Sequence, residues 1–394
     1  MKKLFWNIMF IMAILLPVAG MFSCEKDKGG DDGGVTNNDE LYQSILSSYI
    51  ESTIIPTYKS LAEAALEMRT ANEKLKSDPS DANMKAASDA WMTARVAWEI
   101  SEAFLFGPVG EQALDIDGHI DSWPLELDQI LETLNQEAAD LTGEKAWAEL
   151  DAEVIGFHVT EYLLYRDGQT RPVGDLSEAE LKYLTAATDA LVWDCVLAYV
   201  AWVGENAVAA DIRAVFNENS DIKAHLDANA SYREFAKKLS PQSTGGNYTS
   251  WADALSEIAV GAAEIAGEVG ATKIAEPYEN HRTEDVESWY SWHSLDDYQN
   301  NILSIKNAYL GGMADNSRTT VCLSAYIATV NAALDRDIKA KIEDCLTKIK
   351  AIGTGGLSFY EVVRDQINGE QVDAAVEACI DLQELFDRIP EIIE

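Results

Sequence analysis

Apolar residues recur at helical spacing along most of the chain, and short segments rich in Gly, Pro and Asp separate these runs. No run alternates apolar and polar residues for long enough to predict a sheet. The pattern therefore predicts an all-α protein. The expected helical segments are residues 40–75, 81–106, 125–134, 146–165, 177–203, 250–266, 295–310, 319–352 and 369–388.

Several segments carry local signals that refine this expectation. Ser177 and Glu180 have the spacing of a capping box, in which each side chain bonds the backbone of the other residue. Pro56 is expected to kink or split the first segment, because proline disrupts a helix interior. Residues 319–352 are expected to hold two helices. The polar, irregular stretch 270–288 is expected to be a loop.

The helices are expected to form two bundles that follow one another along the chain. A breaker-rich loop at residues 240–248 separates the halves, which gives an N-terminal domain at 39–240 and a C-terminal domain at 241–394. A faint repeat links them, because one amphipathic helix ends in residues 104–107 (FLFG) and another in residues 308–311 (AYLG). Two helical-bundle domains related by an internal duplication would have this pattern.

The N-terminus has the features of a lipoprotein signal. Lys2 and Lys3 precede an apolar run at residues 4–19, which is too short for a stable membrane-spanning helix. Ser23 and Cys24 follow at the position of a lipobox. We expect residues 1–23 to be a signal peptide, Cys24 to be lipidated and residues 24–38 to be a flexible tether. The alternative is an ordinary secretory signal followed by an accidental cysteine. The expected location is the outer membrane, facing the periplasm or the cell surface.

Composition narrows the classes of partner. The chain has 394 residues, of which 47% are hydrophobic, and a formal net charge of −37. Nucleic-acid binding needs a basic surface, so this charge disfavours it. The lipid membrane is an expected partner only through the Cys24 anchor. An oxidising compartment permits disulfides, but the pairing is undetermined among Cys195, Cys322, Cys345 and Cys379.

The sharpest candidate for chemistry is the sequence Gly156-Phe-His158-Val-Thr-Glu161 within an apolar segment. Residues three apart lie on the same face of a helix, so His158 and Glu161 point the same way. Gly156, two residues before His158, leaves room for another segment to approach closely. An imidazole beside a carboxylate can bind a metal ion or perform acid–base chemistry. The alternative is a buried His–Glu hydrogen bond that only satisfies two polar groups.

A second candidate cluster lies near the end of the segment 81–106. Arg95, Trp98 and Glu102 are three and four residues apart and share one helix face, with Glu99 and Ser101 beside them. The alternative is a salt bridge between helices. Nearby, residues 116–124 (IDGHIDSWP) have the composition of an ordered loop that can line a cleft.

A third cluster gathers polar residues at the expected start of the segment 295–310. Ser294 is expected to cap this helix, with Asp297 in its first turn and Asn301 one turn later. Ser291 and His293 precede the cap. Capping alone would explain Ser294 and Asp297, but it does not explain why so many polar types gather here, and a helix N-terminus can also bind anions.

Familiar enzyme signatures are missing from the sequence. The chain has no His-Glu-x-x-His, Gly-x-Ser-x-Gly, P-loop or Gly-x-Gly-x-x-Gly motif. A zinc site around His158 would therefore need ligands from distant segments.

Taken in order, these motifs resemble the imelysin-like proteins over roughly residues 40–390. The resemblance implies two related helical-bundle domains in a periplasmic or outer-membrane protein of bacterial iron uptake, with iron-uptake membrane proteins as partners. It also implies that His158 and Glu161 form the metal motif of a family named for metallopeptidases. His293 stands where a smaller polar residue is expected, so it would add a ligand or block one. The motifs are Gly156-x-His158-x-x-Glu161, Arg95-x-x-Trp98 with Ser101-Glu102 and Phe106-Gly107-Pro108, and Ser291-x-x-Ser294-Leu295-x-Asp297-Tyr298-x-x-Asn301-Ile302.

These observations lead to the hypothesis of a non-enzymatic lipoprotein that binds iron, another divalent metal or haem in a cleft between the two domains. The alternatives are a metallopeptidase that uses His158 and Glu161, and a surface interaction protein whose polar cluster is structural. The expected ligand-binding residues are Arg95, Trp98, Ser101, Glu102, His158, Glu161, Ser291, His293, Ser294, Asp297 and Asn301, with His158 and Glu161 as metal ligands.

Overall fold

The runs of helical periodicity do form helices in the computed structural model, which describes residues 37–110, 113–136 and 140–393. Cys24 and the predicted signal and tether lie outside the described residues, apart from the last two tether positions. In the first half the elements are α1 (Asn37–Tyr49), α2 (Ile55–Ser77), α3 (Asp81–Glu99), α4 (Ile116–Ile120), α5 (Leu127–Gln136), α6 (Gly143–Glu149), α7 (Gly156–Leu164), β1 (Tyr165–Arg166), β2 (Gln169–Thr170), α8 (Glu178–Val203), α9 (Ala210–Phe216) and α10 (Ser220–Ala228).

The second half is also helical. A π-helical segment, Glu268–Ala275, directly continues its first helix, just as Ile50–Ile54 joins α1 to α2. The elements are α11 (Trp251–Gly267), α12 (Glu276–Glu279), α13 (Ser294–Leu310), α14 (Leu323–Val330), α15 (Ala332–Ile352), α16 (Phe359–Asp365) and α17 (Gly369–Phe386). Among the described residues the only strands are β1 and β2, which have two residues each and pair as an antiparallel hairpin. The predicted all-α class is therefore confirmed.

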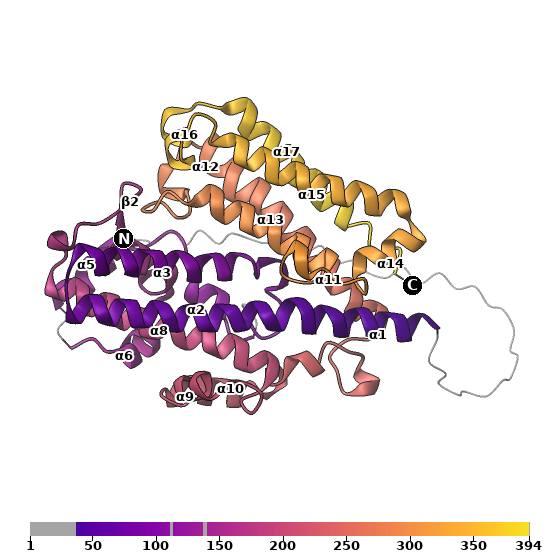
Figure 1. The fold of residues 1–394 in the computed structure, drawn as a ribbon, viewed down its shortest axis with the longest axis horizontal. Coiled ribbons are helices and arrows are strands. Elements are labelled where there is room, and N and C mark those ends of the chain that lie inside the picture. The colour runs from indigo at the N-terminus through magenta and orange to yellow at the C-terminus, as the bar shows by residue number, and fades with distance from the viewer. Residues whose placement is uncertain (1–36, 111–112, 137–139, 394) are drawn as a thin grey trace, which may run out of the picture. The chain divides into compact units, whose positions relative to one another are not determined.

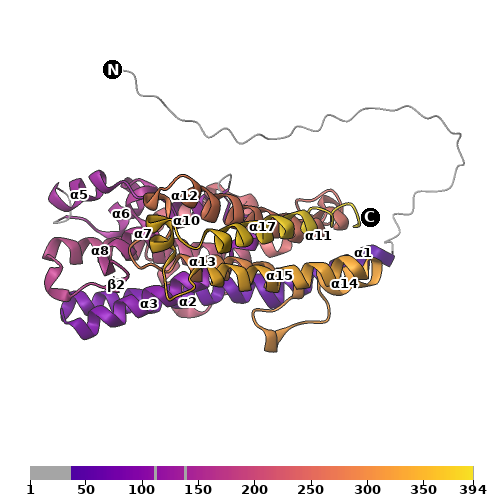
Figure 2. The same ribbon diagram turned by 90° about the horizontal axis from the view of Figure 1, so that it is seen from above.

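The helices pack as two neighbouring groups. In the first, α2 packs against α3 and α8, and α7 and α6 cover other parts of α8. In the second, α15 packs against α17 and α13, and α11 packs against α17 and α13 (Figures 1 and 2). The groups meet where α13 contacts α3 and where α1 contacts α11. Asn37–Glu394 form one compact unit by their contacts, and the boundary at residue 240 stays a prediction.

The longest apolar helix, α8, forms the centre of the first group. It is long and apolar enough to cross a membrane by length and composition, but 89% of its most apolar window is buried inside the protein. Its N-terminus has the predicted capping box: Ser177 accepts a hydrogen bond from the amide of Glu180, and the Glu180 carboxylate accepts one from the amide of Ser177. Burial against α2, α6 and α7 explains its uniform apolar character.

Three expectations about local structure are wrong. Residues 146–165 are not one helix, because Gly156 has a φ of +78° and starts α7 after a break. The stretch 270–288 is not all loop, because its first half belongs to the π-helical segment and α12. Ser294 does not cap α13: the N-cap is His293, and the Ser294 hydroxyl donates to the carbonyl of Glu287.

Candidate metal centre

His158 lies on α7 and is buried, with 1% of its surface exposed. One turn along the helix, the carboxylate of Glu161 approaches its ring, with Nδ1 3.1 Å from Oε2. The predicted pairing of these two residues on one helix face is therefore present. A hydrogen bond at Nδ1 fixes the orientation of the ring and directs its other nitrogen, Nε2, away from α7.

Both oxygens of Glu161 are already engaged. Oε2 faces the His158 ring, while Oε1 accepts hydrogen bonds from the backbone amides of Tyr290 (3.0 Å) and Ser291 (2.7 Å). These amides belong to the segment that precedes α13, so Glu161 fixes that segment to α7. A carboxylate held by two backbone donors and an imidazole has little capacity left for a metal ion. Glu161 therefore orients the histidine in this structure.

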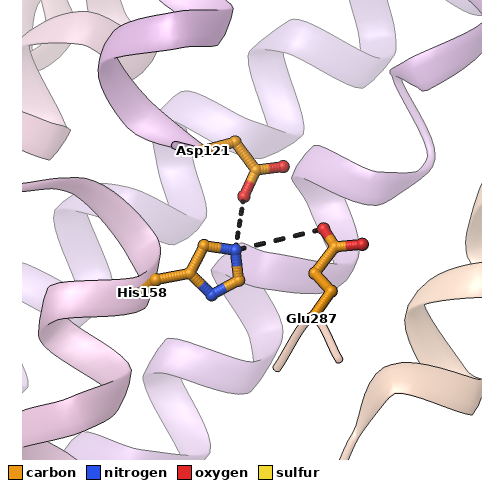
Figure 3. A group of neighbouring side chains, drawn as sticks. All are labelled: Asp121, His158 and Glu287. Carbon is orange, nitrogen blue, oxygen red and sulfur yellow. Dashed lines mark ion pairs between the residues drawn. The ribbon is translucent and has the colours of Figure 1, made fainter. Parts of the chain in front are cut away.

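The free nitrogen of His158 faces two other carboxylates. Nε2 lies 3.2 Å from Oδ1 of Asp121 and 4.0 Å from Oε1 of Glu287. Figure 3 shows both side chains converging on this nitrogen from different parts of the chain. Neither contact has hydrogen-bond geometry, so Nε2 is a buried polar atom without a directed partner among the described residues. Such an atom is costly unless something binds it.

Arg95, on α3, is the main counter-ion of these carboxylates. Its guanidinium is fully buried and forms ion pairs with Glu99, Asp121, Glu287 and, at 3.6 Å, Asp297. These partners come from both halves of the chain. A buried charge is tolerated only when it is paired and hydrogen-bonded, so Arg95 is what allows the carboxylates to gather here.

An acidic cleft of about 230 Å³ reaches this cluster. Among the described residues that line it, Lys273, on the π-helical segment, is the only basic one, and 10% of its side chain is exposed. The indole of Trp98 donates to Asp121 Oδ2 (2.6 Å) and so holds that carboxylate at the wall of the cleft. The acidic lining residues are Glu102, Asp117, Asp121, Glu268, Asp285 and Glu287.

The crowding of carboxylates changes their acidity. Burial raises the pKa of Asp117 to about 7, with Asp121 adding repulsion. Burial also raises the pKa of Asp297 to about 6, although Arg95 opposes the rise. Burial and Arg95 lower the pKa of His158, but the nearby carboxylates of Asp121 and Glu161 outweigh them and raise it to about 9. The centre thus holds protons and cations more tightly than separate side chains would.

The residues present fit a metal ion. One nitrogen and two carboxylate oxygens, from His158, Asp121 and Glu287, lie within 4.8 Å of one another. That spread is about twice a typical metal–ligand bond of about 2.0–2.2 Å. Imidazole with carboxylate is a ligand set suited to iron, zinc and manganese. A second group at the same spacing, Glu99 and Glu102 with Asp121, adjoins the first.

The sequence profile of the family described as imelysin, peptidase M75, matches residues 54–389. The chain belongs to the imelysin family. A curated relative, iron-regulated protein A of Synechococcus elongatus, is 27% identical over 303 residues, which cover 77% of this chain and 72% of the relative.

Two solved structures extend this comparison. A structure described as an iron-regulated protein A precursor from Parabacteroides distasonis is 28% identical, with a TM-score of 0.73, and the match covers 93% of this chain and 98% of that one. An imelysin-like protein from Psychrobacter arcticum is 15% identical, with a TM-score of 0.53 over 90% of this chain and 93% of that one, and shares the fold.

The structure brings together most of the residues that carry the imelysin resemblance. Besides those above, Asp297 accepts a hydrogen bond from Ser288, and Asn301 donates to the carboxylate of Glu99. The remaining residues bond elsewhere. Ser101 donates to the carbonyl of Trp98, Ser291 to the carbonyl of Ser288, and His293 pairs with Asp296 near the surface.

Sequence reasoning did not assign three residues of this imelysin centre to the site: Asp121, Lys273 and Glu287. Asp121 lies in the stretch 116–124, which was expected to line a cleft, so its composition was the available signal. Glu287 and Lys273 lie in the stretch that was expected to be an irregular loop. No local pattern identifies them, because only the packing of the second half onto α3 and α7 brings them to His158.

Proposed function

We propose that this protein is a non-enzymatic lipoprotein of the cell envelope that binds a divalent metal ion, with iron as the physiological cargo. The observation that carries the proposal is the convergence of Asp121 and Glu287, from opposite halves of the chain, on Nε2 of His158, which has no hydrogen bond of good geometry among the described residues. The names of two relatives, iron-regulated protein A and an iron-regulated protein A precursor, support iron as the cargo.

The two polar residues of the Gly156-x-His158-x-x-Glu161 motif have different proposed roles: one binds the metal ion and the other orients the first. His158 would bind the ion through Nε2, and Asp121 and Glu287 would supply carboxylate oxygens. Glu161 would orient the imidazole, in the way that metal-binding histidines are usually held by a carboxylate. The carboxylate ligands proposed here therefore differ from the pair His158 and Glu161 that the sequence motif alone suggests.

The size of the cleft favours a small ligand. Pockets that enclose drug-sized molecules measure about 300–1,000 Å³, whereas the acidic cleft measures about 230 Å³. An ion or a small iron chelate fits this space better than haem does. The acidic lining also favours cations over the carboxylate groups of a haem.

The peptidase class named with the family is the second candidate. A metallopeptidase needs a carboxylate free to act as general base beside the metal. In this structure Glu161 has no free oxygen, because the amides of Tyr290 and Ser291 and the ring of His158 engage it. This engagement favours binding over hydrolysis.

Calorimetric titration of the metal-free protein tests the proposal. We expect Fe²⁺ under anaerobic conditions, and Zn²⁺ as a redox-inert substitute, to bind with one-to-one stoichiometry. His158→Ala and Asp121→Asn should each lose at least about tenfold in affinity. His293→Ala is the matched control, because His293 pairs with Asp296 away from the cleft. Equal affinity in His158→Ala and the parent protein would refute the site.

The envelope anchor requires its own experiment. We propose that lipid on Cys24 holds the mature protein at the outer membrane, where it would act with iron-uptake membrane proteins. Replacing Cys24 by Ser should move the protein from the membrane fraction to the soluble fraction and abolish labelling by a fatty-acid probe. Unchanged membrane association in the Cys24→Ser variant would contradict this anchor.

A further inference from the structure

The ammonium group of Lys273 stands among three carboxylates of the cleft. Its Nζ lies 3.3 Å from Oε2 of Glu287, 3.7 Å from Oε1 of Glu268 and 4.0 Å from Oε2 of Glu102. Charge-assisted hydrogen bonds are shorter, at about 2.7–2.9 Å. The ammonium is therefore stabilised by electrostatic attraction to three carboxylates rather than by a short hydrogen bond to any one of them.

This ammonium and the proposed metal ion use the same carboxylate. Glu287 faces His158 through Oε1 and Lys273 through Oε2. Glu287 and Glu102 are nearly buried, with 8% and 3% of their side chains exposed. Two positive charges a few ångströms apart at such a site repel each other strongly, because little water screens them.

The third partner of Lys273 offers the ammonium another position. The side chain of Glu268 is 48% exposed and lines the same cleft. Glu268 and Lys273 belong to the same π-helical segment, Glu268–Ala275. The lysine side chain has a flexible four-carbon stem. Rotation about its bonds can move the ammonium towards Glu268 and the solvent without any change in the backbone.

We propose that Lys273 is a tethered cation that occupies the cleft in the metal-free protein and is displaced towards Glu268 when a divalent ion binds. This inference rests on the proposed function and concerns its regulation. A monovalent ion gains too little from the carboxylates to displace an ammonium of equal charge. A divalent ion gains more, so Lys273 sets both the affinity of the site and its preference for divalent ions.

The test is calorimetric titration with Zn²⁺ alone of the full mature chain and its variants. Lys273→Met removes the competing charge and should bind Zn²⁺ about tenfold more tightly, a typical size for coupling between two ligands. Lys273→Arg keeps the charge and should restore the affinity of the parent protein to within a few-fold. Lys306→Met is the control, because Lys306 pairs with Asp315 and Glu343 outside the cleft.

A second variant covers the case in which Lys273→Met does not fold. Glu268→Gln removes the outer position of the ammonium and should weaken Zn²⁺ binding several-fold while leaving the metal-free melting temperature nearly unchanged, because Glu268 is half exposed. The role of Lys273 is overturned by unchanged or weaker binding in Lys273→Met, or by unchanged binding in Glu268→Gln, if Asp121→Asn still weakens binding by at least about tenfold. If the parent protein binds no Zn²⁺ at all, the proposed function fails together with this inference.

Discussion

Gly156 lies so close to the backbone of Ile120 that a Cβ atom at position 156 would stand 2.6 Å from the Ile120 carbonyl oxygen. This contact joins the start of α7, which carries His158, to the end of α4, where Asp121 follows Ile120. A glycine is required here for two reasons, its φ of +78° and the missing space. The first residue of the sequence motif thus sets the distance between two of the proposed ligands.

Gly156→Ala should therefore lower both stability and metal affinity. The strained φ and the clash with Ile120 should cost about 1–3 kcal/mol in the free energy of unfolding. Any relief of the clash moves Asp121 away from His158, so Zn²⁺ affinity should fall as well. Urea unfolding and calorimetry measure the two effects. Gly174→Ala is the control, because Gly174 has open space around it, and equal behaviour of the two variants would contradict the requirement.

Glu161→Gln should impair metal binding with only a small loss of stability. The amide oxygen of Gln can still accept hydrogen bonds from Tyr290 and Ser291, but its amide nitrogen would donate to Nδ1 of His158. The ring then carries its proton on Nε2, the atom proposed to bind metal. We expect an affinity loss of about 10–100-fold, as for other residues that support metal ligands. NMR of the ring nitrogens at a pH above the His158 pKa of about 9, where the ring is neutral, would show the change of tautomer, and unchanged affinity would argue against the orienting role.

Arg95→Met should destabilise the metal-free protein severely. It leaves Glu99, Asp121, Glu287 and Asp297 without their shared counter-ion, and such a loss typically costs about 3–5 kcal/mol. Added Zn²⁺ should restore more stability to this variant than to the parent, since the ion supplies the missing positive charge. Thermal unfolding with and without Zn²⁺ measures both effects.

The matched control for Arg95→Met is Arg69→Met. Arg69 also pairs with several carboxylates, but 21% of its side chain is exposed and its partners lie near the surface. Its removal should cost about 1 kcal/mol or less, and Zn²⁺ should not compensate for it. A comparable loss in both variants would mean that the buried cluster is not specially dependent on Arg95.

The metal-free protein should lose stability as the pH rises from about 4 to about 9, first through the two carboxyl groups and above about pH 6.5 through His158. The folded-state pKa values of Asp297 (about 6), Asp117 (about 7) and His158 (about 9) all lie above their unfolded values of about 3.9, 3.9 and 6.5. A group whose pKa is raised on folding stabilises the protein below its unfolded pKa, and this contribution is lost as the pH passes its folded pKa.

Thermal unfolding in a chelator, at several pH values, measures this effect. We expect a fall of several degrees in the melting temperature between pH 6 and pH 9. In Asp117→Asn the part of the slope near pH 7 should disappear. A melting temperature that stays level or rises over this range in the parent protein would contradict the charge arrangement described here.

Local periodicity was enough to predict the long helices and the pairing of His158 with Glu161, but not short helices such as α9, α10 and α16. Side chains three residues apart share a helix face whatever the rest of the chain does, so that contact needs no knowledge of packing. The capping box at Ser177 and Glu180 was predictable for the same reason. The break at Gly156 was not, because the apolar run continues through it and only the close approach of Ile120 requires the change of backbone direction.

The carboxylates that face His158 could not be predicted from local pattern. Asp121 and Glu287 are 37 residues before and 129 residues after His158 in the sequence numbering, and their contact depends on tertiary packing. Lys273 could not be predicted as a site residue for a different reason. Its π-helical segment contains Gly270 and charged residues and lacks the usual apolar period, yet it packs against α17, where a Cβ at Gly270 would stand 2.9 Å from Cys379.

The ion pairs of Arg95 with residues of both halves also make the buried cluster depend on the whole fold. A chain that ends before Glu287 would leave Nε2 of His158 with Asp121 alone, and a chain that ends after α3 would lack His158 altogether. Without Glu287 and Asp297, Arg95 would also lose the two carboxylates that the second half supplies. Metal binding at the proposed site would therefore also report that the two halves of the chain are present and packed together.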